Sequence, residues 1–141
     1  MEVSVVRRRV HSALASARER ARQRRRTSAE ADSAYADFLA RVAVPLARQV
    51  TSALKAEGYT FTVSTPERGL RVSLDRGLDD FIEFALLTDD EPQVIGRIRR
   101  TRGSRTIEEE RPVKPGTSPR DLSEEDVLEF LVGALEPWLE G

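Results

Sequence analysis

The spacing of apolar residues changes near residue 59 from a helical period to alternation, and this change sets the fold class. Tyr59, Phe61 and Val63 alternate with threonine and serine, and residues 70–74 alternate again after the turn TPERG. Strands that bury one face show this period of two, and a short turn containing glycine joins two such strands. The segment therefore predicts an antiparallel hairpin.

Two more strands are predicted around the turn TDDEP, with Ile82, Phe84 and Leu86 facing Val94 and Ile98. The segment RTIEEERPV that follows is poor in apolar residues and contains a proline. Both features suit an edge strand, because proline cannot donate to the ladder and charges discourage further pairing. We therefore expect a meander of four or five antiparallel strands.

Helical spacing appears on both sides of this region. Near the N-terminus, Val3, Val6, Val10 and Leu14 step by three and four residues, as on the apolar face of an amphipathic helix. A second apolar stripe extends over residues 35–54. The two stripes are almost in phase, so the two segments form either one long helix or two helices with a break between them.

Local signals indicate where helices begin, bend and end. The acids that follow Ser28 favour a break or bend near Thr27–Ser28 and a new helix start there. Pro45 predicts a kink because its ring clashes with the preceding turn, and Gly58 suits a C-terminal stop. Ser123 and Asp126 resemble a capping pair that opens the last helix. The buried face of that helix is expected to comprise Val127, Leu128, Leu131, Ala134, Leu135, Trp138 and Leu139.

Together these elements predict an α+β fold with N-terminal helices, a four- or five-stranded antiparallel β-meander and a C-terminal helix. The helices at residues 35–54 and 127–139 carry enough apolar surface to cover one face of the sheet. We assign residues 1–27 to a basic helical arm and residues 28–141 to the α+β domain. A chain of 141 residues can form such a core without disulfides, and this chain contains no cysteine.

Charge is distributed unevenly along the chain. Residues 1–26 hold nine arginines against two glutamates, a net charge of +7, whereas the whole chain has a net charge of −1. After Arg120 there are seven acids and no base. The basic end and the acidic end therefore complement each other, either within one chain or between two copies.

Residues suited to catalysis or metal binding are sparse. His11 is the single histidine and has no acid near it in the sequence, and the chain lacks a Gly-x-Ser-x-Gly elbow and a glycine-rich phosphate loop. The acid clusters do not match a calcium loop and indicate turns instead. They comprise Asp75, Asp79, Asp80, Asp89, Asp90 and Glu91. We expect a non-enzymatic protein with no catalytic site, metal or cofactor.

Protein binding is the function that the sequence favours. The arm has a narrow apolar stripe and no obvious place on a sheet that two better helices already cover, so we expect it to pack on a second copy or another protein. The expected contact residues are Val3, Val6, Val10 and Leu14 for the apolar part and Arg18, Arg22, Arg25 and Arg26 for the charged flank.

Nonspecific nucleic-acid binding is the alternative. Two arginine clusters could neutralise phosphates, although no aromatic residue is interleaved with them for base stacking. They comprise Arg20, Arg22, Arg24, Arg25 and Arg26 in the arm and Arg97, Arg99, Arg100, Arg102 and Arg105 around a predicted hairpin turn.

A membrane role is not expected, since no apolar run approaches the roughly 20 residues that span a bilayer. The first residues also lack the apolar core of a signal peptide. A cytoplasmic location is therefore expected.

Overall fold

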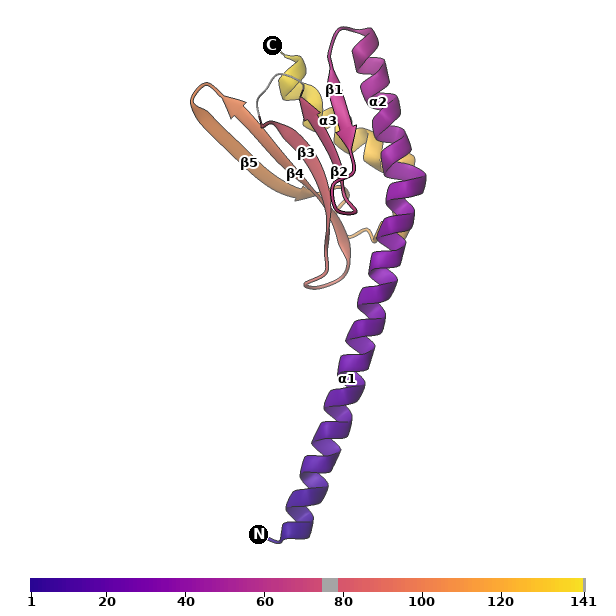
Figure 1. The fold of residues 1–141 in the computed structure, drawn as a ribbon, viewed down its shortest axis with the longest axis vertical. Helices are drawn as coiled ribbons and strands as arrows, with labels where there is room; N and C mark the ends of the chain where they lie inside the picture. The colour runs from indigo at the N-terminus through magenta and orange to yellow at the C-terminus, as the bar shows by residue number, and fades with distance from the viewer. Residues whose placement is uncertain (75–78, 141) are drawn as a thin grey trace.

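Five antiparallel strands form a meander in which each strand pairs with the next along the chain. The protein is seen here in a computed structural model that describes residues 1–74 and 79–140 (Figure 1). Asp75, one of the acids weighed above, lies outside the described residues. The strands are β1 (Phe61–Ser64), β2 (Leu70–Leu74), β3 (Phe81–Leu87), β4 (Gln93–Arg102) and β5 (Arg105–Pro112).

The register of the sheet follows the alternation in the sequence. Val72 pairs with Ile82 and Ile82 with Ile98, so three buried side chains lie side by side on one face of the sheet. The segment RTIEEERPV, which is poor in apolar residues, forms the edge strand β5, as its composition predicts.

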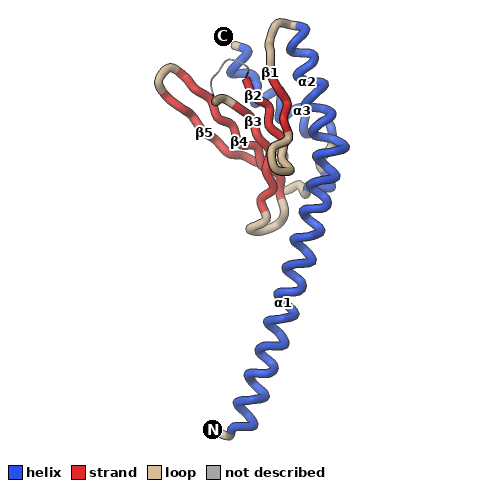
Figure 2. The backbone as a smooth tube through the Cα atoms, in the orientation of Figure 1, coloured by secondary structure: helices blue, strands red, loops and turns tan. Residues whose placement is uncertain are grey.

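The N-terminal part of the chain is one continuous helix, α1 (Val3–Phe38). The break expected near Thr27–Ser28 is absent, and Figure 2 shows the helix uninterrupted there. Neither residue breaks a helix by itself, since threonine and serine cost only a fraction of a kcal/mol relative to alanine. The possibility of one long helix is therefore the correct one.

A π-helical turn, η1 (Leu39–Ala43), separates α1 from α2 (Val44–Ala56). In this turn the Val44 N–H donates to the Leu39 carbonyl, five residues earlier. Pro45 follows immediately and lacks the N–H for an α-helical bond to Arg41, so the wider turn relieves the clash of its ring. The helix axis bends at this point (Figure 1), as the proline predicts.

The helix α3 (Glu124–Leu139) begins with the predicted capping box, in which Ser123 and Asp126 each accept a hydrogen bond from the other's backbone N–H. A short 3-10 turn, η2 (Pro119–Asp121), precedes it. One prediction for its buried face is wrong, because Leu128 is 41% exposed. Phe130 is buried instead.

One hydrophobic core joins the sheet to the end of α1, η1, α2 and α3. Phe130 packs directly on β4 at Gly96, where a Cβ atom would come within 2.1 Å of the ring. The two apolar helical regions therefore cover one face of the sheet, as expected, and the rest of α1 is left without a place on it.

Candidate interaction site on the N-terminal arm

Most of α1 stands clear of the domain. In the structure the arm extends over residues 3–30, a few residues beyond the range 1–27 assigned from the sequence, and all of these residues are exposed except Val5 and Ala21, which are half-buried. The arm extends away from the sheet and from α3 (Figure 1). At 1.5 Å per residue it is about 42 Å long.

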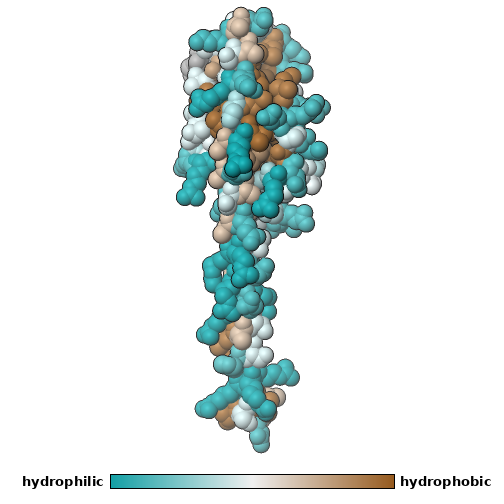
Figure 3. Space-filling model, turned by 90° about the vertical axis from the view of Figure 1, so that its right-hand side faces the viewer, coloured by the Kyte–Doolittle hydropathy of each residue, from teal (hydrophilic) through white to brown (hydrophobic). Residues whose placement is uncertain are grey.

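The apolar seam of the arm is formed by Val3, Val6, Val10 and Leu14. These side chains keep 67%, 43%, 53% and 47% of their surface exposed. Figure 3 shows brown apolar side chains near the free end of the arm, with teal polar ones around them. Val6, Val10 and Leu14 also line an open groove along the helix together with His11. The structure thus leaves exposed the residues that the sequence assigned to an apolar contact.

The base of the arm is anchored on the same side of the helix. Steps of three and four residues lead from Leu14 through Ala17 and Ala21 toward the buried Ala31, so the seam and the anchor lie on nearly one side of α1. Tyr35, one turn further, is 8% exposed, and its hydroxyl has no hydrogen-bond partner in the described structure. Burial raises the pKa of Tyr35 to about 12; the Glu83 carboxylate adds to this rise and Arg97 opposes it.

The arginines of the arm are exposed and mostly unneutralised. Arg22 pairs with Glu19 at 2.6 Å, and this is the only ion pair of the arm in the described part of the chain. Arg26 donates to the Gln23 side chain at 3.4 Å. The expected charged flank is therefore accessible to a partner.

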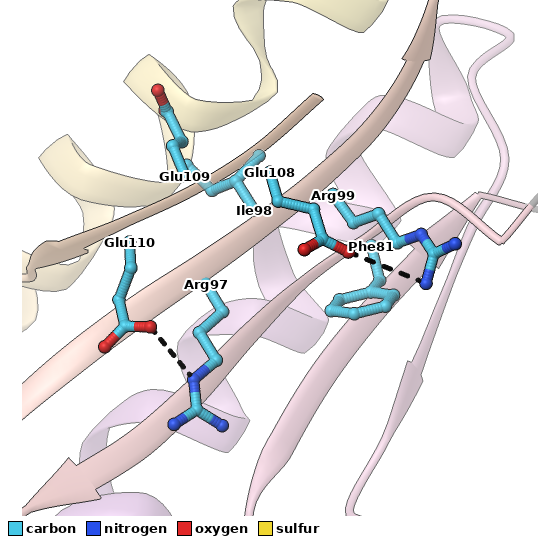
Figure 4. A pocket seen from close by; sticks show the side chains of 7 residues that line it. All are labelled: Phe81, Arg97, Ile98, Arg99, Glu108, Glu109 and Glu110. Atoms are coloured by element: carbon cyan, nitrogen blue, oxygen red, sulfur yellow. Dashed lines mark ion pairs between the residues drawn. The ribbon is translucent and has the colours of Figure 1, made fainter. Parts of the chain in front are cut away.

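The arginines of β4 lie in a different electrostatic setting. Arg97 pairs with Glu110 at 3.5 Å, and Arg99 lies 3.3 Å from Asp79 and 3.7 Å from Glu108. Figure 4 shows the two cross-strand pairs at a pocket of about 270 Å³. Because these guanidinium groups face carboxylates on neighbouring strands, this sheet face presents alternating charge and no uniform basic patch.

The two arginine clusters of the alternative hypothesis are not brought together. The turn between β4 and β5, with Arg102 and Arg105 beside it, lies at the end of the sheet opposite to the arm (Figure 1). The neighbouring strand β5 carries Glu108, Glu109 and Glu110, which pair with residues 97–99 of β4. The second cluster is therefore interleaved with carboxylates and does not continue the basic surface of the arm.

A second exposed apolar pair occurs on α3. Leu128 and Val132 are 41% and 44% exposed and lie one turn apart on the side that faces away from the core. We call this surface the acidic face, because exposed glutamates surround the pair. It comprises Glu124, Glu125, Leu128, Glu129, Val132 and Glu136. The sequence pattern does not reveal this surface, because it places Leu128 on the buried side of the helix.

Asp80 is a second residue whose role the sequence did not reveal. It is 2% exposed, accepts a hydrogen bond from the Thr101 N–H at 2.9 Å and accepts another from the Trp138 indole at 3.1 Å. It therefore joins β3, β4 and the end of α3 and serves the fold. Its partners are 21 and 58 residues away in the chain, so no local pattern marks it.

Comparisons with known protein families, curated proteins and solved structures found no match to this chain. Among residues 1–74 and 79–140, no three or more metal-ligating side chains of His, Cys, Asp or Glu are grouped together. Over the same residues, every helix is too short or too polar to cross a bilayer.

Proposed function

We propose that this chain is a small non-enzymatic interaction module that associates with a second copy of itself, or with another protein, through the apolar seam of the arm. The observation that carries the proposal is the exposure of four large aliphatic side chains on one stripe of a helix that projects from the domain. Helices without a packing partner are marginally stable in water, so a partner on the seam would stabilise the arm.

Burial of the seam accounts for most of the expected affinity. Full burial of a valine or leucine side chain contributes about 1.5–3 kcal/mol, so covering half-exposed ones contributes about 1 kcal/mol each. Exposed ion pairs contribute about 0–1 kcal/mol each. The flanking arginines would therefore determine orientation and choice of partner more than affinity.

Sedimentation velocity of the full chain over a range of concentrations tests self-association. A variant with Val10→Gln and Leu14→Gln should remain monomeric where the unmodified chain dimerises. Glutamine is a good helix former, so the arm itself is retained. The control variant, Ser12→Gln with Ser16→Gln, carries its two glutamines on the opposite side of the arm and should leave dimerisation unchanged.

Where the unmodified chain dimerises, equal sedimentation of the two variants would contradict a role for the seam. A partner protein other than a second copy would leave the unmodified chain monomeric, and a pull-down with the same pair of variants then tests whether the seam holds that partner. A cytoplasmic location without a cofactor stays the prediction from the sequence.

The second candidate is nonspecific nucleic-acid binding by the arm, which the exposure of its unpaired arginines favours. Anisotropy of a labelled DNA duplex at low salt tests it. Arg24→Gln with Arg25→Gln should reduce the slope of log affinity against log salt by about two. Val10→Gln with Leu14→Gln should leave this binding intact, which separates phosphate contact from the apolar contact.

A further inference from the structure

The acidic face of α3 matches the arm in both apolar spacing and charge. Val10 and Leu14 are four residues apart on the arm, and Leu128 and Val132 are four residues apart on α3. All four are 41–53% exposed. Residues 1–26 carry a net charge of +7, whereas the chain beyond Arg120 carries seven acids and no base.

An arm cannot reach the acidic face of its own chain. Leu14 precedes Tyr35, the first residue of α1 in the core, by 21 residues of uninterrupted helix, so it lies about 32 Å along the axis from the point where α1 enters the core. α3 packs on that core and has 16 residues, or a length of about 24 Å. Figure 1 shows the arm leading away from it. The face that the arm covers must belong to another molecule.

Charge disfavours packing of one arm on another. Each arm would bring a net charge of +7 to the contact, and the arginines beside the two seams would repel each other in water of low ionic strength. The acidic face offers the same kind of apolar pair with carboxylates around it. Complementary charge of this kind selects the partner and its orientation.

We infer that the apolar seam of the arm docks on the acidic face of α3 in a second copy of this chain. This inference rests on the proposed self-association and names the surface that receives the arm. Every copy carries both surfaces, so a two-fold axis lets two chains make the contact twice and close into a dimer.

Charge reversal tests the inference in the full chain. Arg7→Glu with Arg18→Glu reverses charge beside the seam, and Glu125→Lys with Glu129→Lys reverses the acidic face. Each pair of changes should weaken dimerisation at least about tenfold, since the altered contacts occur twice per dimer and attraction becomes repulsion. A chain with all four changes restores opposite charges and should dimerise within about threefold of the unmodified chain.

The same variants distinguish failure of the inference from failure of the proposed function. If arms pack on arms, the α3 variant dimerises normally and the arm variant dimerises more tightly, which overturns the inference and keeps self-association. An unmodified chain that stays monomeric at all concentrations overturns both the inference and the proposed self-association. Helix content by circular dichroism checks that every variant is folded, and all four positions are exposed.

Disulfide trapping tests the contact directly, because the chain has no cysteine of its own. A mixture of a Val10→Cys chain and a Val132→Cys chain should yield the mixed disulfide dimer on oxidation. Ser12→Cys, on the opposite side of the arm, should yield little of it with the same partner. A Val10→Cys chain linked mainly to itself, or equal yields from both arm positions, would overturn the inference.

Discussion

Replacement of Gly96 by alanine should destabilise the fold because α3 packs directly on this position of β4. A Cβ atom at Gly96 would lie 2.1 Å from Cζ and 2.6 Å from Cε1 of Phe130. Carbon atoms in contact are about 3.5–4.0 Å apart, so the ring would have to move by roughly 1.5 Å.

The ring of Phe130 has little room to move. It is 8% exposed, meets the ring of Phe84 edge-on with the centroids 5.7 Å apart, and lies 5.3 Å from the guanidinium carbon of Arg111. Overpacking costs about 1–3 kcal/mol, and a displaced aromatic pair costs about 0.5–1.5 kcal/mol. Alanine recovers about 0.5–1 kcal/mol of backbone entropy. The free energy of unfolding should therefore fall by about 1–3 kcal/mol.

Urea unfolding and the thermal midpoint measure this loss. Gly133→Ala serves as the control, because a Cβ atom there meets nothing within 4 Å and alanine favours a helix by about 1 kcal/mol. Adding Phe130→Leu to Gly96→Ala should cost less than the sum of the two single changes, since the shorter side chain makes room. A Gly96→Ala protein as stable as the unmodified one, or strict additivity in the double variant, would refute the contact argument.

Three further substitutions probe the fold. Asp80→Asn should lower the free energy of unfolding, measured in urea, by about 1–3 kcal/mol, because one buried donor loses its acceptor. Asp79→Asn on the exposed neighbour should change this free energy by less than about 0.5 kcal/mol. Equal effects of the two substitutions would contradict the assigned hydrogen bonds. Tyr35→Phe should stabilise the protein by about 1 kcal/mol at pH 7, because it removes an unsatisfied hydroxyl. It should also abolish the loss of stability between pH 10 and 12 that follows from a Tyr35 pKa raised to about 12. A less stable variant would indicate a hydrogen-bond partner for that hydroxyl. Hydrogen bonding by the Ser123 backbone N–H holds the pKa of Asp126 below its ordinary value, so its stabilisation is present above the unfolded pKa and is lost as the pH falls through the lowered pKa. Asp126→Asn should therefore destabilise the protein more at pH 7 than at pH 3 in thermal unfolding, and equal effects at both would contradict this.

The sheet and its order were predictable because the signals are local. The alternation around Val72, Ile82 and Ile98 determines which side chains face the core, and a one-residue slip would expose all of them. The capping pair at Ser123 and Asp126 lies within one helical turn, so its spacing alone reveals it.

Features that depend on distant residues were not predictable. Leu128 falls on an apolar stripe of α3, and only the position of the sheet decides that Phe130 turns inward in its place. In the sequence Asp80 resembles a turn residue, because its hydrogen-bond partners Thr101 and Trp138 are distant along the chain. The fold and the acidic character of the last helix were accessible from the sequence, whereas the exposed apolar pair on α3 was not, because it depends on which side of the helix the core occupies.

The π-helical turn at Leu39–Ala43 has a consequence for the direction in which the arm presents its valines. Such a turn holds one residue more than an α-helical turn, and each residue of an α-helix rotates the chain by about 100°. Loss of a single residue there would rotate everything before it around the helix axis by that angle. The direction in which the exposed valines of the arm point is thus determined at the π-helical turn beside Pro45. This turn lies about 45 Å along the helix from Val10, the nearest of those valines.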